Sequence, residues 1–104
     1  MPTKVNLEYL TTAISDFEEI VKYHITQAGV PYAKKIYTTM ESTISKLEDF
    51  PLLGQIHPDP LLAAQGYRKL VLTQTYVAIY RIVDKTVYIY RIVNAKTDYP
   101  KLLR

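Results

Sequence analysis

Residues 76–93 read YVAIYRIVDKTVYIYRIV, and the tetrapeptide YRIV occurs in this stretch twice, ten residues apart. Both copies lie in runs rich in β-branched and aromatic residues, which are typical of strands. Asp84 and Lys85 separate the two runs, and a two-residue link suits a tight turn. The stretch therefore predicts a β-hairpin whose strands span residues 76–83 and 86–93.

The turn also predicts a register for this hairpin. If Val83 pairs with Thr86, the two faces follow from the alternation of side chains along each strand. The expected pairs are Arg81 with Tyr88, Ile79 with Tyr90 and Val77 with Ile92 on one face, and Tyr80 with Ile89, Ala78 with Arg91 and Tyr76 with Val93 on the other. Both faces are largely apolar, so we expect other elements to cover each of them.

Upstream of the hairpin the sequence takes on a helical period. Apolar residues recur every three or four positions over residues 14–28 and again over residues 33–47, which predicts two amphipathic helices. Gly29 suits the end of the first helix and Pro31 the start of the second. The short link predicts an antiparallel helical hairpin, and we expect each apolar stripe to be buried against the sheet.

The segments that flank the two helices complete the predicted order of elements. Alternating apolar residues from Val5 to Tyr9 predict a short strand, and Thr11 or Thr12 is expected to cap the first helix. Residues 51–66 are rich in proline and glycine, which predicts a long loop with a helical turn near residues 61–65. Residues 67–73 are expected to form a strand.

Composition excludes several kinds of site. The chain of 104 residues has no cysteine, three glycines, and two histidines that lie 33 residues apart. Disulfides, thiolate ligands and a cysteine nucleophile are thereby excluded, and a glycine-rich phosphate loop or a histidine metal site is not expected. No apolar run approaches the roughly 20 residues of a membrane span. We expect a cytoplasmic protein that uses neither a metal nor a cofactor.

The charges are distributed unevenly. Residues 67–104 carry eight basic and two acidic side chains, whereas residues 1–66 carry five basic and eight acidic ones. Six of the ten tyrosines also lie in the basic part. Such a half suits either a polyanion or an acidic protein, and charge does not choose between them.

Basic residues on the predicted strands are the first candidates for a site. A guanidinium within a sheet needs water, a carboxylate or a phosphate, so Arg81 and Arg91 either bind an anion or pair with helix acids such as Glu18 and Glu19. Lys69, Lys96 and Tyr99 complete a set able to surround a phosphate, although Tyr99 equally fits a packing role. The histidines are interpreted more simply, His24 as a packed residue of a helix and His57 as a polar loop residue.

The order of these features resembles the RelE/ParE superfamily of toxins from bacterial type II toxin–antitoxin systems. The likeness spans nearly the whole chain and rests on these segments: Ala13 with DFEEI at 16–20, Leu47 with Phe50, Pro51 and Gly54, GYRKL at 66–70, YRIV at 80–83, Val87 with Ile89, RIV at 91–93, and Asp98 with Tyr99. It implies an α+β fold in which an N-terminal strand and an antiparallel helical hairpin pack on a mostly antiparallel curved sheet. Residues 1–104 would form a single domain of this kind.

The superfamily carries two activities on one fold, and the resemblance leaves both open. RelE-type members cut messenger RNA in the ribosomal A site, whereas ParE-type members poison DNA gyrase. The GYR, YRIV and KTDY segments look closer to the ParE-type branch, so gyrase is the expected target, with the ribosome and mRNA as the alternative. Either branch implies a cognate acidic antitoxin as a partner and no role for a membrane.

The resemblance also implies site residues. If the chain is an endonuclease, the candidates for catalysis are Lys69, Arg81, Lys96 and Tyr99. Val77 stands where RelE-type members have an arginine, and the loss of such a cation would cost several kcal/mol of transition-state stabilisation. The residues expected to contact the target are mostly basic or aromatic: Arg68, Arg81, Tyr88, Tyr90, Arg91, Lys96, Asp98 and Tyr99.

Overall fold

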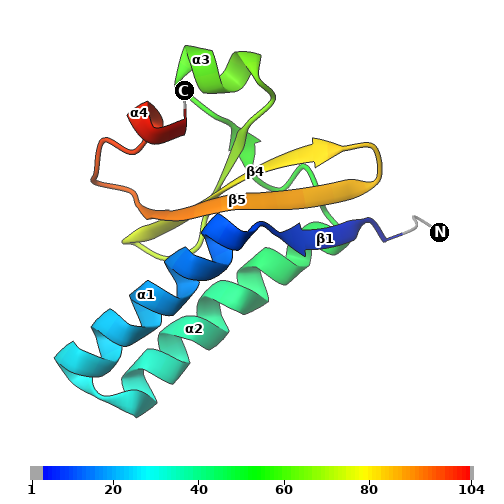
Figure 1. The fold of residues 1–104 in the computed structure, drawn as a ribbon. Coiled ribbons are helices and arrows are strands. Elements are labelled where there is room, and N and C mark those ends of the chain that lie inside the picture. Colours follow the sequence, from blue (N-terminus) through cyan, green and yellow to red (C-terminus); the bar gives the residue numbers. More distant parts are fainter. Residues whose placement is uncertain (1–3, 104) are drawn as a thin grey trace.

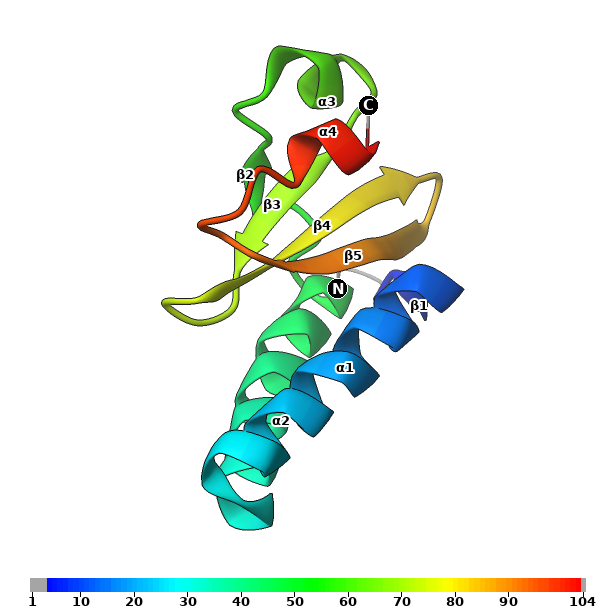
Figure 2. The same ribbon diagram turned by 60° about the vertical axis from the view of Figure 1, so that its left-hand side comes forward.

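A five-stranded sheet lies between two sets of helices (Figure 1). The structure is a computed structural model, and it describes residues 4–103. The strands lie in the order β1-β5-β4-β3-β2. The long helices α1 and α2 cover one face of the sheet, and the short helices α3 and α4 lie over the other (Figures 1 and 2). This arrangement confirms the α+β fold with an N-terminal strand, a helical hairpin and a mostly antiparallel sheet.

The central hairpin consists of β4 (Tyr76–Val83) and β5 (Thr86–Asn94). Val83 pairs with Thr86 across the predicted two-residue turn. Asp84 adopts a positive φ of 55° in this turn, a backbone conformation that aspartate tolerates better than most residues do. The prediction of the two strands and of their turn is therefore confirmed.

The predicted register is wrong beyond Tyr80. Tyr80 pairs with Ile89 as expected, but Ile79 pairs with Arg91 instead of Tyr90. Tyr90 is thus the extra residue of a β-bulge, which places two residues of one strand opposite one residue of the other. The shift persists to the end of the hairpin, where the pairs are Ala78 with Ile92, Val77 with Val93 and Tyr76 with Asn94.

The remaining strands extend the hairpin on both sides. On one side β1 (Asn6–Tyr9) runs parallel to β5, and on the other β3 (Arg68–Val71) runs antiparallel to β4. A two-residue strand, β2 (Gln55–Ile56), pairs with β3 at the far edge, inside the stretch predicted as a loop. The predicted strand over residues 67–73 is shorter in the structure because Leu72 and Thr73 already bond to the carbonyl of Tyr76 in the turn.

The helical hairpin consists of α1 (Thr11–Ala28) and α2 (Val30–Ser45), which is continued by a short 3-10 helix, η1 (Lys46–Glu48). Gly29 joins the helices with a φ of 89°, which L side chains rarely adopt. The expected threonine cap is absent. Leu10 occupies the N-cap position without a side-chain hydrogen bond, and the Thr12 hydroxyl donates instead to the Tyr90 carbonyl.

The hairpin extends well beyond the sheet (Figure 2), so the sheet covers only part of its apolar stripes. Phe17, Met40 and Ile44 are buried against the sheet. Ile25 is 40% exposed and Tyr37 is 45% exposed. The expectation that each stripe is fully buried against the sheet is therefore wrong for the outer half of the hairpin.

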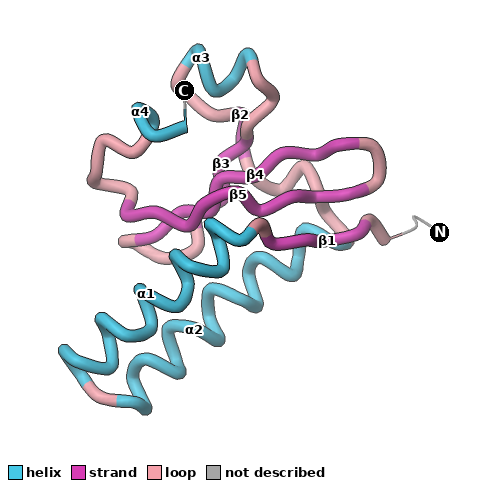
Figure 3. Tube along the Cα trace, in the orientation of Figure 1, coloured by secondary structure: helices cyan, strands magenta, loops and turns pink. Residues whose placement is uncertain are grey.

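The opposite face of the sheet, here called the second face, has its own small core. It is covered by α3 (Pro60–Ala64), at the predicted helical turn, and by α4 (Pro100–Leu103) near the C-terminus. The buried side chains of this core are Leu62, Tyr67, Val77, Ile79, Val93 and Tyr99. Long connecting loops lead to both helices (Figure 3). The prediction that other elements cover both faces is confirmed.

Within residues 4–103, no helix is both long enough and apolar enough to cross a membrane.

Tyr80 ties the loop after α2 to the sheet. Its side chain is fully buried, and its hydroxyl donates to the Pro51 carbonyl at 2.8 Å and accepts from the Gly54 N–H at 2.9 Å. A Cβ atom added at Gly54 would lie 2.7 Å from both the Lys69 carbonyl oxygen and the Tyr80 ring. The loop can approach this closely because residue 54 has no side chain.

We therefore expect Gly54→Ala to lower the free energy of unfolding by about 1–3 kcal/mol, the usual cost of overpacking a close contact. Urea denaturation followed by circular dichroism measures the change. Gln55→Ala is the matched control, because Gln55 is exposed and lies next to Gly54. Equal unfolding midpoints for the two variants would contradict the packing described here.

Candidate functional site

The second face holds most of the residues that the sequence singles out. Tyr67, Arg81 and Tyr90 form a stack on it. The carbon at the centre of the Arg81 guanidinium lies 5.0 Å from the centre of the Tyr67 ring and 4.9 Å from that of the Tyr90 ring. Both distances suit cation–π attraction. Tyr90 lies two residues beyond Tyr88, the cross-strand partner of Arg81, so its ring is on the same face and reaches the Arg81 side chain.

The Arg81 guanidinium is held by internal hydrogen bonds as well as by the two rings. Its Nε and Nη2 atoms both donate to the Tyr90 hydroxyl oxygen, and Nη1 donates to the Gln65 carbonyl at 3.1 Å. The hydrogen bond to Tyr90 is the largest cause of the raised pKa of Arg81, and burial acts against it. Arg81 thus fixes the second face to the end of α3.

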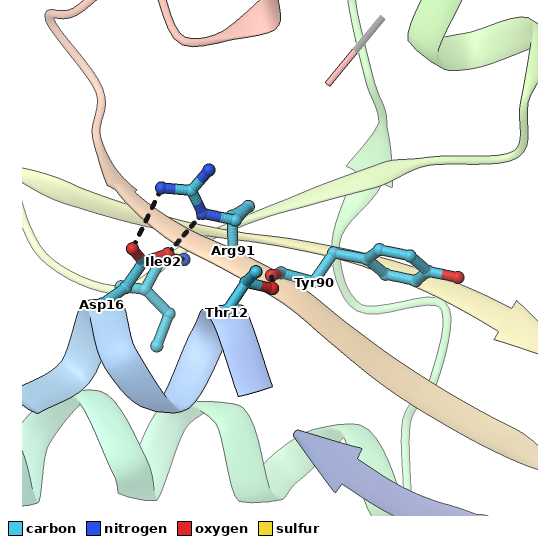
Figure 4. Close-up of polar contacts among 5 residues, drawn as sticks. All are labelled: Thr12, Asp16, Tyr90, Arg91 and Ile92. Atoms are coloured by element: carbon cyan, nitrogen blue, oxygen red, sulfur yellow. Dashed lines mark hydrogen bonds and ion pairs between the residues drawn. The ribbon is translucent and has the colours of Figure 1, made fainter. Parts of the chain in front are cut away.

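Arg91 is held at the edge of β5 by an acid from α1 (Figure 4). Its Nε donates to Asp16 Oδ2 at 2.7 Å, and its Nη2 donates to Asp16 Oδ1 at 3.0 Å. The same Oδ2 accepts the backbone N–H of Ile92 at 2.9 Å. The hydrogen bond to Asp16 is the largest cause of the raised pKa of Arg91. The helix acid that pairs with Arg91 is therefore Asp16, and not Glu18 or Glu19.

Beyond the end of β1, the side chains of Asp16 and Thr12 take the place of a neighbouring strand along β5. The Thr12 hydroxyl donates to the Tyr90 carbonyl at 2.7 Å, and Asp16 accepts from the Ile92 N–H. Buried backbone groups need such partners when no neighbouring strand supplies them. The DFEEI segment that contributes to the resemblance thus includes a residue that joins α1 to β5.

The other predicted site residues lie apart from one another. Arg68 Nε donates to the Gly54 carbonyl at 3.0 Å. Tyr88 is half-buried on β5, opposite Arg81. Lys96 is exposed after the end of β5, and Asp98 forms an exposed ion pair with Lys101 at 3.0 Å. The three arginines therefore bind three different internal partners, and their guanidinium groups do not converge on one point.

Tyr99 and His57 form a buried pair beneath the C-terminal segment. The Tyr99 hydroxyl lies 2.8 Å from His57 Nε2, and the two side chains are 7% and 3% exposed. Burial raises the pKa of Tyr99 and lowers that of His57, and the charge on Lys69 lowers the pKa of His57 further. His57 is thus a core residue and not a solvated loop residue. Nothing in the sequence around it signals that role.

His24 lies at the outer end of the sheet and contacts several tyrosines. Its Nε2 atom lies 3.0 Å from the Tyr76 hydroxyl, and its ring packs against Tyr23 and Tyr32. These contacts confirm the interpretation of His24 as a packed helix residue. His24 therefore has a structural role in α1.

A groove between α1 and α2 is a further candidate site, and it lies in the helical hairpin that the sequence predicted. It has a volume of about 850 Å³. Its lining is mainly apolar and includes Ile14, Phe17, Ile25, Ala33 and Tyr37. The sequence signal was present in the two apolar stripes, which are longer than the sheet that they meet.

Residues 7–99 match the family described as the ParE toxin of the type II toxin-antitoxin system parDE. The chain belongs to this family. The matched range begins in β1 and ends at Tyr99, so it includes every element except α4. The chain is therefore a toxin of the type II toxin–antitoxin class, as the resemblance implied. No curated protein matches the chain.

Solved structures share the fold of this ParE-family toxin. A chain of the chromosomal ParDE system from P. aeruginosa is 21% identical, with a TM-score of 0.76 over 89% of this chain and 98% of that chain. A chain of the toxin–antitoxin complex RelBE2 from Mycobacterium tuberculosis is 26% identical, with a TM-score of 0.57 over 88% and 99%. A chain of the E. coli DinJ-YafQ complex is 15% identical, with a TM-score of 0.63 over 97% and 99%.

The positions of the candidate catalytic residues in this ParE-family toxin can be compared with what RNA cleavage requires. Cleavage at the 2′-hydroxyl needs a base, cations at the phosphate and a proton donor for the leaving oxygen. Arg81 is held by Tyr90, the Tyr99 hydroxyl faces His57, and Val77 is buried in the core of the second face. Lys69 lies on the same face, near His57, and Lys96 lies in the exposed segment after β5.

Proposed function

We propose that this toxin stops bacterial growth by binding and poisoning DNA gyrase in the cytoplasm. The observation that carries the proposal is the internal engagement of Arg81 and Arg91. A nuclease needs cations that are free to hold a phosphate, whereas a protein inhibitor needs only a shaped surface. Val77 at the position of the RelE-type arginine supports the same choice, as does the family match.

The surface proposed to meet gyrase consists of the C-terminal segment and the adjacent part of β5. Lys96 and Asp98 are exposed in this segment, and Tyr88 and Tyr90 are half-buried on the strand that leads to it. Tyrosine is enriched in protein interfaces, and exposed charges such as those of Lys96 and Asp98 suit the polar rim of an interface. Arg81 supports this surface from within through its hydrogen bonds to Tyr90, whereas Arg68 and Arg91 are bonded to the Gly54 carbonyl and to Asp16.

A RelE-like mRNA endonuclease is the second candidate function. The observation in its favour is that Lys69, His57 and Tyr99 lie close together on the second face. The cation of Lys69 could hold a phosphate there. In this case the chain would be an enzyme that acts with the ribosome.

The antitoxin is proposed to be an acidic protein whose amphipathic segment folds into the groove between α1 and α2. The groove is largely apolar, and Lys22 and Lys34 lie along its sides together with Glu18 and Glu41. A disordered segment that folds on binding suits such a groove, because apolar residues on one helix face fill it. The charges along the groove balance, so the attraction for an acidic partner comes from the basic residues 67–104, while the apolar lining supplies the contact in the groove.

Induction of the chain in cells separates the two functions. A gyrase poison produces DNA breaks and plasmids with altered supercoiling, while mRNA stays uncut by primer extension. An endonuclease produces codon-spaced mRNA cuts that disappear in Lys69→Ala, with plasmid topoisomers unchanged. Normal growth at high expression would contradict both proposals.

Lys96→Glu is expected to weaken growth inhibition about tenfold, measured as the inducer level that halves the growth rate, because it reverses one exposed charge at the interface. Lys35→Glu is the control, because Lys35 is exposed on α2. These single changes are preferable to a deletion of residues 96–104, which would abolish toxicity but would also remove Tyr99 from the core of the second face. Equal loss in the two variants would place the interface elsewhere.

A further inference from the structure

The C-terminal segment is attached to the second face through a buried hydrogen bond. Residues 97–103 turn back over the sheet and end in α4 (Figures 1 and 2). Tyr99 enters the core beside Leu62 and Val93, and its hydroxyl meets His57 Nε2 at 2.8 Å. The rings of Tyr99 and His57 lie nearly perpendicular, at 83°. The position of the segment thus depends on a contact between two residues 42 positions apart.

The other ring nitrogen fixes the protonation state of His57. The backbone N–H of Asp59 donates to His57 Nδ1 at 3.0 Å. A nitrogen that accepts a hydrogen bond carries no proton of its own, so the proton of the neutral ring is on Nε2. His57 therefore donates to the Tyr99 hydroxyl oxygen. A second proton on Nδ1 would face the Asp59 N–H and would break that hydrogen bond. Nε2 would still donate to Tyr99, but the ring would then be a cation in a site where it is only 3% exposed, so the protonated ring favours leaving the core for water.

The charges around His57 come from each of the segments that pack against it. Lys69 of β3 disfavours a cationic ring, whereas the carboxylate of Asp59 favours it. The Asp59 carboxylate also accepts the N–H groups of Leu61 and Leu62 at the start of α3. Tyr99 is neutral, since burial raises the pKa of its hydroxyl. Burial is the largest cause of the lowered pKa of His57, so the ring is neutral at physiological pH.

We propose that His57 is a positioning residue: its neutral form holds Tyr99, and with it the C-terminal segment, on the second face, and protonation of the ring releases the segment. Asp98 lies at the start of this segment and Lys96 directly precedes it, so His57 also affects the position of both side chains. The link to gyrase rests on the proposed function. The attachment itself does not, because it is a property of the isolated chain.

The direction in which the pKa of His57 is shifted determines how the stability of the attachment changes with pH. In the unfolded chain His57 takes up a proton near pH 6.5, as an ordinary histidine does, whereas in the folded chain it does so at a lower pH. The attachment therefore contributes its full stability above about pH 6.5 and loses it as the pH falls through the folded pKa. At low pH we expect the segment to detach while the sheet stays folded.

Hydrogen exchange of the full-length chain, followed by NMR and corrected for the intrinsic effect of pH, tests the proposal. The reporter is the Leu102 amide, which donates to the Tyr99 carbonyl within the segment. Its protection should fall about tenfold as the pH is lowered from neutral until the His57 ring is protonated, the ratio that one typical hydrogen bond supplies. The fall should have the same midpoint as the titration of the His57 ring. The Ile79 amide in the sheet should stay protected throughout.

Two variants separate positioning from general stability. Tyr99→Phe keeps the ring but loses the hydroxyl, so Leu102 protection should be about tenfold lower already at neutral pH. His57→Gln keeps one acceptor and one donor but does not titrate. Leu102 in this variant should therefore keep at low pH the protection that it has at neutral pH. Growth inhibition measured for both variants should follow the protection of Leu102 at neutral pH.

Several results would overturn the proposal. These are unchanged Leu102 protection in Tyr99→Phe, the same pH dependence in His57→Gln as in the natural chain, or a fall in Leu102 protection whose midpoint differs from that of the His57 titration. Failure of the gyrase proposal would show differently, because the exchange experiment contains no target. Leu102 protection would then behave as described while cells showed no change in plasmid supercoiling.

Discussion

Replacing Asp16 with alanine is expected to lower the free energy of unfolding by about 2–4 kcal/mol. The carboxylate accepts two N–H groups of Arg91 and the backbone N–H of Ile92. The Asp16 and Arg91 side chains are only 14% and 27% exposed. Water therefore replaces the lost carboxylate poorly, and both a cation and a backbone donor are left without their partner.

Urea denaturation of Asp16→Ala, Arg91→Met and the double variant measures this coupling. The double variant should lose less stability than the sum of the single variants, because removing both charges leaves no unpaired ion. Glu19→Ala is the matched control on the same helix, since Glu19 is exposed and its change should cost less than about 0.5 kcal/mol. Additive losses in the double variant would show that the pair contributes little.

Ile25→Glu is expected to weaken binding of the cognate antitoxin about 30-fold or more, the effect of losing one central interface residue. Ile25 lines the groove between α1 and α2 and is 40% exposed in the free toxin. A buried glutamate would lose its water on binding without gaining a partner. The fold of the toxin itself should tolerate the change because the side chain already reaches solvent.

Titration calorimetry with the purified antitoxin measures this affinity, and growth rescue by co-expression reports it in cells. Leu52→Glu is the control, because Leu52 is 68% exposed and belongs to the loop after η1, outside the groove. Loss of rescue by Leu52→Glu, with normal rescue for Ile25→Glu, would place the antitoxin on the other surface. Circular dichroism of both variants checks that each remains folded.

Local sequence signals were sufficient to predict most of the elements. The turn at Asp84 and Lys85, the stop at Gly29 and the apolar period of both helices each act over a few residues, so each is visible in the chain alone. The β-bulge at Tyr90 is different in kind. Tyr90 contacts Thr12 and Arg81 there, and both contacts join residues that are distant in sequence or on separate strands.

The candidate site could likewise be predicted only in part from the sequence. Basic residues could be located along the strands, but their partners could not. Arg91 faces Asp16 because α1 crosses the edge of β5, and Arg81 contacts Tyr90, which lies on the same face two residues beyond the cross-strand partner Tyr88. His57 gave no local signal, since its burial depends on a segment more than 40 residues away that returns to cover it.

The place where β1 ends has a consequence for how the toxin behaves at high concentration. Beyond Tyr9, the outer edge of β5 is met by side chains of α1 and not by another strand. A bare strand edge is a template for pairing with other molecules and hence for amyloid-like aggregation. Thr12 and Asp16 occupy this edge, so α1 blocks the pairing of another strand at this place.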